Sequence, residues 1–399
     1  MACRLRFLLA ASAFALAACS NEQAASSDAA QRGAKGGGDP ALQTTLAEPA
    51  PEGARALNVE ILAEGLVNPW CVAFLPDGTI LVTERAGRLR VIRDGALVAE
   101  PVAGVPEVYA DNQAGLFDIL PHPDFAENRT VFLAYAHGTD RANALRVARA
   151  TFDGAALNDL EVIYEAKPLK ESGYHYGGKI VYAPDGTLWV SVGEGSRYKE
   201  LAQDMTTSFG AIIRINQDGS IPEGNPDFGE NALPELWTKG HRNPQGLAWD
   251  GERGILWANE HGPRGGDEIN IIEKGANYGW PLASYGIDYN GARITPFTEY
   301  EGTRQPFKYW TPSIGVSGLA VYRGDLFPDW DGDLFVGAMA TRALHRIDLD
   351  EAGEEVGEER YLVGERVRDV RVGPDGAIYV TTEDRQGAPV GQVLRLTPQ

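Results

Sequence analysis

Cysteine, basic charge and sustained helical periodicity are all scarce in this sequence. Of its three cysteines, Cys3 and Cys19 fall in an N-terminal segment, which leaves Cys71 as a lone thiol and excludes an internal disulfide framework. The 36 basic residues face 56 acidic ones, and the net charge of −20 disfavours binding to nucleic acid or to an anionic membrane surface. We therefore expect no nucleic-acid partner, and we expect Cys71 to pack in the core beside Trp70.

An apolar run of about a dozen residues near the N-terminus is typical of a signal peptide, and it is too short to span a bilayer as a mature helix. Residues 1–18 carry Arg4 and Arg6 before this run, which ends in Leu-Ala-Ala followed by Cys19. That string resembles a bacterial lipobox, with Cys19 as the lipidated residue; the alternative is an ordinary secretory signal with a chance cysteine. Residues 19–56 are small and polar, so we expect a flexible tether. The segment predicts an exported, periplasmic protein held at a membrane only by its lipid.

From about residue 57 the sequence alternates short apolar or β-branched runs with Gly, Pro and Asp turns, which predicts a nearly all-β domain over residues 57–399. Proline presets φ for a turn, Asp caps it and Gly accepts a positive φ. The turn Pro76-Asp77-Gly78 recurs at 184–186 and 374–376, and looser relatives stand at 121–124, 249–251 and 330–332. Six such marks indicate a repeated four-stranded unit, as in a β-propeller with extra loops inserted. The alternative is a sandwich combined with a barrel.

Charged, aromatic and glycine residues gather in five segments between predicted strands, where a propeller directs loops toward its axis. Among their side chains, the close pair Arg366 and Arg368, a third arginine at Arg242, histidine and clustered acids suit a small polyanion, a metal ion and a general base. Taken singly, each is more typical of a turn or a solvated edge. The segments are residues 112–115, 173–179, 241–246, 260–268 and 366–369.

Over residues 57–396 the chain resembles a known family, and four motifs that occur in the family's order carry the resemblance. They are residues 241–246, 260–270, 277–281 and 366–370. The chain is similar to the soluble pyrroloquinoline-quinone (PQQ) sugar dehydrogenases, and most closely to the aldose sugar dehydrogenases of the glucose/sorbosone dehydrogenase family. The resemblance implies a six-bladed β-propeller with inserted loops over the central axis. It also implies oxidation of the anomeric C1 hydroxyl of aldose sugars to lactones, with PQQ as the hydride acceptor.

The resemblance assigns roles to particular residues. His175 is implied as the general base, and imidazole suits this because its pKa of about 6.5 leaves it mostly neutral at pH 7. Tyr174 stands before it where the family often has an acid or Asn, and the family's cofactor lysine has no counterpart, so Arg342 is the candidate to replace it. The other implied cofactor contacts are Gln113, Arg242, Asn243, Arg366 and Arg368.

A calcium ion is implied as well, because PQQ carries three carboxylates and Ca²⁺ accepts carboxylate and main-chain oxygens. The resemblance places the cofactor calcium at the carbonyls of Gly262 and Pro263. A second, structural calcium maps onto Glu268 and the carbonyl of Tyr278.

Two other functions compete with an oxidoreductase. A calcium-dependent lactonase or other hydrolase needs a metal and a base but has no use for arginines suited to three carboxylates, so Arg366 and Arg368 discriminate against it. A non-catalytic binding propeller fits the fold alone. The sequence leaves open which sugar is oxidised, whether the electron acceptor is a quinone or a cytochrome, and whether the protein is a monomer or a homodimer.

Overall fold

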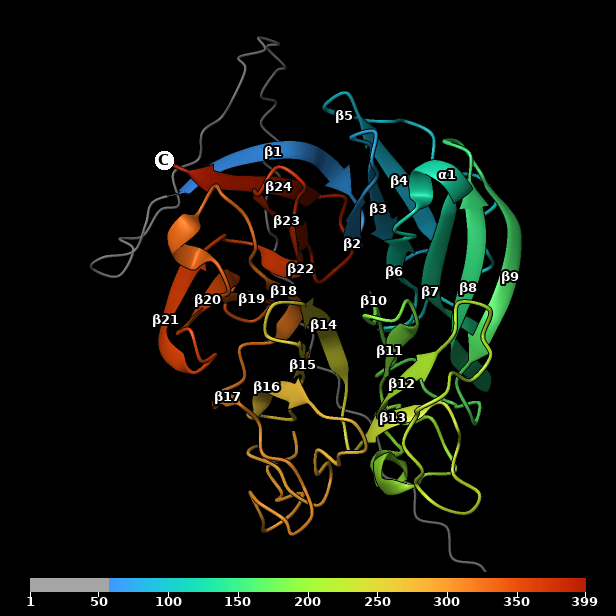
Figure 1. Cartoon of the computed structure of the whole chain (residues 1–399), viewed down its shortest axis with the longest axis vertical. Coiled ribbons are helices and arrows are strands. Elements are labelled where there is room, and N and C mark those ends of the chain that lie inside the picture. The colour runs from blue at the N-terminus through green and yellow to red at the C-terminus, as the bar shows by residue number, and fades with distance from the viewer. Residues whose placement is uncertain (1–56) are drawn as a thin grey trace, which may run out of the picture. The chain divides into compact units, whose positions relative to one another are not determined.

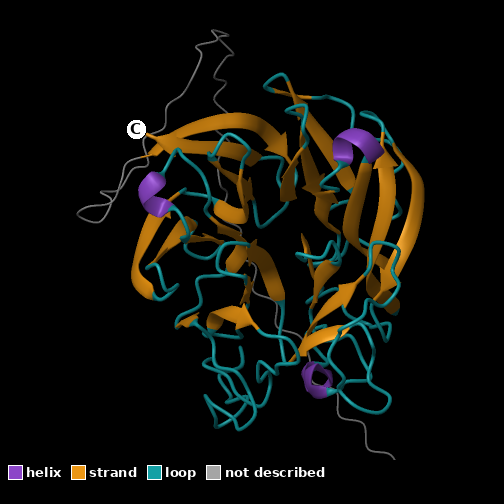
Figure 2. Ribbon diagram, in the orientation of Figure 1, coloured by secondary structure: helices purple, strands orange, loops and turns teal. Residues whose placement is uncertain are grey.

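Strands account for almost all regular structure in the computed structural model, which describes residues 57–399 (Figures 1 and 2). In this part of the chain, helix is limited to α1 (Phe125–Asn128) and to 3₁₀ turns at Lys199–Gln203 and Pro328–Trp330. No helix among the described residues is long and apolar enough to cross a membrane. The signal peptide, the lipidated Cys19 and the tether predicted for residues 1–56 lie outside the described residues.

The strands form six four-stranded sheets, and five of these are built from consecutive strands. The first contains β2 (Pro69–Phe74), β3 (Ile80–Glu84), β4 (Arg88–Arg93) and β5 (Ala96–Leu97), and the second β6 (Leu116–Pro121), β7 (Thr130–Thr139), β8 (Ala142–Phe152) and β9 (Leu157–Glu165). The third contains β10 (Gly177–Tyr182), β11 (Leu188–Val192), β12 (Ala211–Ile215) and β13 (Leu236–Lys239). The fourth contains β14 (Pro244–Asp250), β15 (Ile255–Glu260), β16 (Asp267–Ile272) and β17 (Lys308–Trp310), and the fifth β18 (Val316–Val321), β19 (Leu334–Ala338), β20 (Ala343–Leu349) and β21 (Glu355–Leu362).

The sixth sheet joins the two ends of the described chain. It contains β22 (Arg366–Val372), β23 (Ile378–Glu383) and β24 (Gly391–Pro398), and its outer strand is β1 (Leu57–Leu66) from the beginning of the domain. β1 pairs antiparallel with β24, from Leu57 opposite Pro398 to Leu66 opposite Gly391. This pairing closes the ring by backbone hydrogen bonds between residues more than 300 positions apart.

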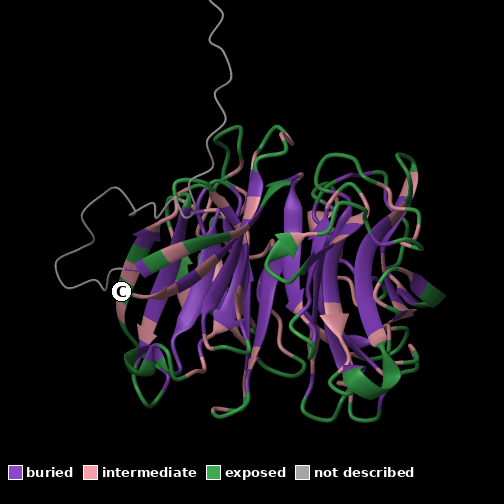
Figure 3. Ribbon diagram, turned by 90° about the horizontal axis from the view of Figure 1, so that it is seen from above, coloured by how far each residue is buried: buried purple, intermediate pink, exposed green. Residues whose placement is uncertain are grey.

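The first strands of the sheets line the centre of the ring. β2, β6, β10, β14, β18 and β22 each pack against the next, and β22 packs against β2. The sheets therefore form a closed six-bladed propeller, as predicted, with the interior strands buried (Figures 1 and 3). We call the end of the ring at which these six strands begin the top end, and the opposite end the bottom end.

The predicted turns occupy the same place in every blade, between the first and second strands at the bottom end. The Asp77 carboxylate accepts a hydrogen bond from the backbone N–H of Thr79 at 3.0 Å, and Asp185 and Asp375 repeat this contact two residues on. Gly78 has φ +84°, a backbone conformation that side-chain-bearing residues rarely adopt. The repeat in the sequence is therefore the repeat of the blades.

Buried charges connect four blades near the axis. The Lys179 ammonium lies 2.7 Å from Asp369 Oδ1 and 3.7 Å from Asp118 Oδ1, and Arg371 pairs with both carboxylates. Asp369 also accepts the backbone N–H of Val72 in β2 at 3.1 Å. Each carboxylate thus has a cationic partner, as burial requires. Cys71 is buried beside this network, as expected for a packing residue.

Candidate active site

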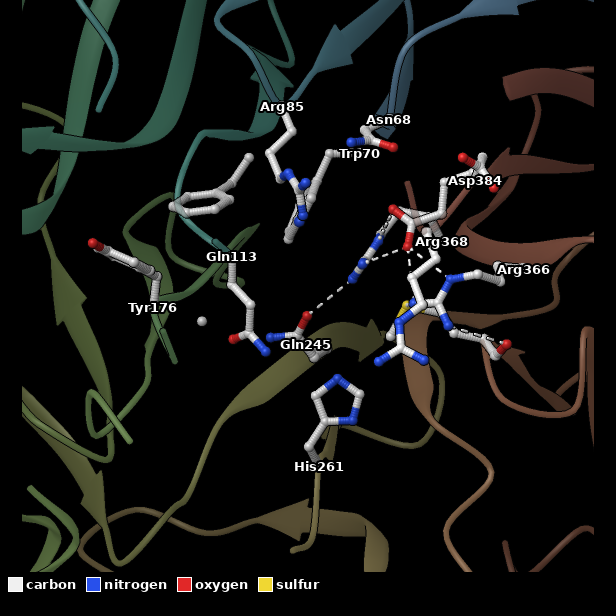
Figure 4. Close-up of a pocket in the computed structure, with 15 residues that line it drawn as sticks. Asn68, Trp70, Arg85, Gln113, Tyr176, Gln245, His261, Arg366, Arg368 and Asp384 are labelled. Carbon is white, nitrogen blue, oxygen red and sulfur yellow. Dashed lines mark hydrogen bonds and ion pairs between the residues drawn. The ribbon is translucent and has the colours of Figure 1, made fainter. Parts of the chain in front are cut away.

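A cavity of about 140 Å³ lies at the top end of the ring, where the first strands begin (Figure 4). Its lining comes from all six blades, which places the cavity on the axis. Trp70, Phe117 and Tyr176 contribute aromatic rings to it. The polar and charged lining residues are Asn68, Arg85, Gln113, Gln245, His261, Arg366, Arg368, Glu383, Asp384 and Arg385. A planar polar ligand would meet ring faces and charged groups together.

Positive charge is concentrated in this cavity although the chain as a whole carries −20. Four arginines and two carboxylates line it, so its formal charge is +2. Burial and the neighbouring Arg368 lower the pKa of Arg85, because cationic groups crowd one another there with few anions between them. Guanidinium groups are planar donors that match carboxylates in pairs of hydrogen bonds. The cavity therefore favours a polyanionic ligand.

One buried carboxylate holds two of the arginines. Arg366 and Arg368 stand two positions apart at the start of β22, and Glu383 ends the neighbouring strand β23. The distance from Nη2 to Glu383 Oε1 is 3.0 Å for Arg366 and 2.9 Å for Arg368. Burial alone would raise the pKa of Glu383, but Arg368 and Arg366 hold it below its ordinary value. The carboxylate orients both guanidinium groups and remains ionised while it does so.

His175 directly precedes the cavity-lining Tyr176, and it has the left-handed φ of +50°, which is uncommon for a residue with a side chain. Its backbone N–H donates to Oε1 of Gln113 at 3.0 Å, and the Lys170 ammonium donates to its carbonyl at 3.1 Å. Its ring Nδ1 lies 2.8 Å from Oε1 of Glu194. When Glu194 is ionised its oxygens can only accept, so Nδ1 carries the proton and Nε2 keeps its lone pair. The ring is thus held as the tautomer that can act as a base at Nε2.

Burial controls the charge of both members of this pair. Burial, together with the cationic Arg242 and Lys170, lowers the pKa of His175 well below its ordinary value. Burial raises the pKa of Glu194 to about 7, although Arg242 and Lys170 act in the opposite direction. The imidazole is therefore neutral at neutral pH. The carboxylate that orients it titrates close to neutrality.

A smaller pocket of about 20 Å³ adjoins the cavity, since His261 lines both. It contains all four residues for which metal ligation was predicted, namely Gly262, Pro263, Glu268 and Tyr278. A volume of this size holds one water-sized group. Within residues 57–399 no cluster of three or more His, Cys, Asp or Glu side chains could hold a metal. A cation in this pocket would therefore depend on main-chain oxygens as well as on Glu268.

The small pocket carries more negative than positive charge, because Glu260 and Glu268 line it against one cation, Arg242. Burial, and after it the neighbouring Glu260, raises the pKa of Glu268 well above its ordinary value. Asn270 donates to both carboxylates, at 3.1 Å and 3.3 Å, but its own Oδ1 is buried and accepts no hydrogen bond from any described residue. The crowded carboxylates and the main-chain carbonyls of the lining residues form a donor set of hard oxygens. These groups fit a calcium ion.

Residues 66–395 match the family model described as Glucose / Sorbosone dehydrogenase. The chain belongs to the glucose/sorbosone dehydrogenase family. The aldose sugar dehydrogenase YliI of Escherichia coli is 40% identical over 354 residues, which cover 86% of this chain and 93% of that protein. Quinoprotein glucose dehydrogenase B of Acinetobacter calcoaceticus is 27% identical over 408 residues, covering 81% and 85%. The PQQ-bound form of the aldose sugar dehydrogenase of Streptomyces coelicolor matches with a TM-score of 0.69 at 26% identity, covering 86% of this chain and 98% of that one.

Most of the predicted site residues of this glucose/sorbosone dehydrogenase family member converge at the top end. Gln113, Arg366 and Arg368 line the cavity, and Arg242 lines the smaller pocket. Asn243 lies beneath them and accepts the backbone N–H of Gly177 at 3.1 Å.

Arg342 is placed differently from these residues. Its side chain is exposed in the turn between β19 and β20, and Nη1 donates to the carbonyl of Gly364 at 3.4 Å. Met339, three residues earlier, lines the cavity in its stead. The catalytic and ligand-binding roles of all these residues stay predictions.

Sequence reasoning missed the acids that orient the basic groups. Glu194 orients His175 even though Tyr174 precedes the histidine; the Tyr174 hydroxyl donates instead to Asn112 Oδ1 at 2.8 Å. Arg85 and Glu383 were also missed. A repeated position in the sequence could have identified three of these acids, because a glutamate stands at or just after the end of the second strand in several blades. The pairs within one blade are Glu194 with His175, Glu260 with His241 at 2.7 Å, and Glu383 with Arg366.

Proposed function

We propose that this protein is a PQQ-dependent dehydrogenase that oxidises the anomeric C1 hydroxyl of aldose sugars to lactones. The observation that carries the proposal is a cavity of charge +2 with arginine and aromatic lining, next to a neutral histidine held by a carboxylate. Membership of the glucose/sorbosone dehydrogenase family supports the same reaction class. PQQ, when bound, supplies a quinone carbonyl that accepts the hydride from C1.

The chain's own residues bind the anionic cofactor and move one proton. Arg85, Arg366 and Arg368 offset negative charge in the cavity, and Glu383 keeps two of them oriented. Nε2 of His175 takes the proton of the anomeric hydroxyl as C1 loses its hydride, so that the C1–O single bond becomes the lactone carbonyl. The Glu194 carboxylate then stabilises the imidazolium that forms. Glu194 is a positioning residue in this scheme.

Calcium is part of the proposal. The carbonyls of Gly262 and Pro263, the Glu268 carboxylate and the carbonyl of Tyr278 surround the small pocket and would hold the ion. A bound Ca²⁺ would neutralise the carboxylates that now raise the pKa of Glu268. It would also add positive charge beside the arginine-lined cavity. We further propose Arg242 and Asn243 as cofactor contacts, and we assign no such contact to the exposed Arg342, which lines neither pocket.

Reconstitution tests the reaction class. The full chain is incubated with PQQ and Ca²⁺, and dye-linked oxidation of a panel of aldoses is measured, with PQQ-free and magnesium-only controls. We expect activity that needs both additions. Lactone hydrolysis without PQQ would favour the hydrolase instead, and failure to bind PQQ would contradict the proposal.

Variants assign the roles. His175→Asn should lower kcat roughly a hundredfold or more while PQQ still binds, whereas the partly exposed His137→Asn is the matched control and should retain activity. Arg366→Gln combined with Arg368→Gln should weaken PQQ binding in a direct titration without unfolding the chain. Normal turnover of His175→Asn would remove it from the role of base.

Localisation and electron transfer extend the proposal. We propose that the protein is exported to the periplasm and anchored by a lipid on Cys19, and that a quinone or a cytochrome accepts its electrons. A homodimer is compatible with this scheme but not required by it, because one chain supplies the lining of the cavity from all six blades.

A further inference from the structure

A second cavity lies between the third and fourth blades, at the bottom end of the ring. Its volume of about 400 Å³ lies within the range of roughly 300–1,000 Å³ typical of small-molecule sites. Its lining starts at Ala183, just after β10 ends, and includes Trp249 at the end of β14 and Leu256 at the start of β15. All three positions are at the end of the ring opposite His175, so this cavity is separate from the candidate active site.

Three of the chain's eight tryptophans line this cavity. Trp189 is buried at the centre, and Trp237 and Trp249 flank it with ring centroids 5.9 Å and 5.5 Å away. The flanking rings are tilted by 55° and 43° to the central one, and they are partly exposed whereas Trp189 is buried. Trp189 Nε1 is buried and has no hydrogen-bond partner among the described residues.

Charged groups border the tryptophans. The buried Arg214 pairs with the exposed Asp185 carboxylate, donates to Thr187 Oγ1 at 2.9 Å, and lies 5.3 Å from the centre of the Trp237 ring. Glu223 also lines the cavity. These groups give the rim acceptors and donors at fixed positions, while the floor is aromatic.

We infer that this cavity is a second saccharide-binding site that takes a neutral oligosaccharide by packing pyranose rings against the partly exposed Trp237 and Trp249. A pyranose has a face of C–H groups, which suits the electron-rich face of an indole, and an edge of hydroxyls, which suits carboxylates and guanidinium. A wholly apolar ligand would offer no acceptor to the unpartnered Trp189 Nε1 and no partner to the exposed oxygens of Asp185. An anion would meet Asp185, Glu223 and a chain of charge −20. Two partly exposed indole rings, one on either side of Trp189, offer contact to more than one ring of a sugar chain.

Binding at this site does not depend on the proposed oxidation, because it needs neither PQQ nor His175. The site would hold a saccharide chain at the bottom end of the ring, opposite the candidate active site. Its occupancy can therefore be measured on the full chain without cofactor.

Isothermal titration of the full chain with methyl β-cellobioside and methyl α-maltoside tests the proposal, because neither glycoside has a free anomeric hydroxyl to oxidise. We expect saturable binding of at least one glycoside, and we expect Trp249→Ala to weaken it about tenfold through loss of one stacking ring. Trp310→Ala is the matched control, since Trp310 lies on β17 outside this cavity, and it should bind like the unmodified chain. Aldose oxidation by reconstituted Trp249→Ala should be unchanged.

Trp237→Ala and Trp249→Phe keep the test valid if Trp249→Ala does not fold. We expect Trp237→Ala to weaken binding as well, and Trp249→Phe to retain most of it because an aromatic face remains. Absence of saturable binding at the solubility limit of both glycosides would overturn the proposal. Equal binding by Trp249→Ala and the unmodified chain, or binding of a short-chain benzoquinone in place of the glycosides, would also overturn it.

Discussion

Replacing Glu194 by Gln tests whether a buried carboxylate prepares His175 as a base. The substitution keeps the volume of the side chain but removes its charge, and Oε1 of Glu194 lies 2.8 Å from Nδ1 of His175. As the proposed reaction proceeds the imidazole becomes cationic, so the contact changes from a hydrogen bond with one charged partner to an ion pair. A hydrogen bond to a charged group contributes about 1.5–3 kcal/mol.

That contribution sets the size of the expected effect. Each 1.36 kcal/mol of lost transition-state stabilisation lowers the rate tenfold, so Glu194→Gln should lower kcat roughly 10- to 150-fold. PQQ binding should be unchanged, because Glu194 does not line the cavity. The assay is steady-state dye-linked oxidation by reconstituted enzyme, with PQQ affinity titrated separately.

The pH profile separates an electrostatic role from a merely structural one. Burial raises the pKa of Glu194 to about 7, so the fraction of ionised carboxylate rises as the pH increases from 6 to 8. In the unmodified enzyme, kcat should rise through this window. In Glu194→Gln the rise should disappear, because no carboxylate remains to titrate. An unchanged kcat, or an unchanged rise near pH 7 in the variant, would refute the reasoning.

Two further predictions concern the centre of the ring and the N-terminus. Lys179→Met removes a buried cation that lies 2.7 Å from Asp369, so it should lower the free energy of unfolding by about 3 kcal/mol in chemical denaturation. This is the lower end for a broken buried pair, because Arg371 still contacts Asp369. Lys199→Met at a more exposed position should change the free energy of unfolding by less than about 0.5 kcal/mol, and equal effects of the two variants would contradict the role of the network. Cys19→Ser should move the protein from the membrane fraction to the soluble periplasmic fraction, and unaltered membrane association would count against lipidation.

The sequence by itself determined the number and kind of repeating units. Each turn between the first and second strands is a local device, in which an Asp such as Asp77 caps the backbone two residues on and a Gly such as Gly78 takes a positive φ. Such interactions can be predicted from the sequence because the two partners are neighbours in the chain. The same holds for Arg366 and Arg368, because they stand two positions apart within one short segment. The family motifs likewise lie within short segments.

The tertiary structure alone decided which side chains meet. Glu194 reaches His175 because β10 and β11 are paired, and Arg85 reaches the pair at β22 because the ring closes. Burial then shifts the pKa values of these groups, and burial depends on all six blades together. The same is true of the pairing of β1 with β24 and of the three tryptophans at the bottom end. These contacts join residues that are distant in the sequence, so no local sequence pattern predicts them.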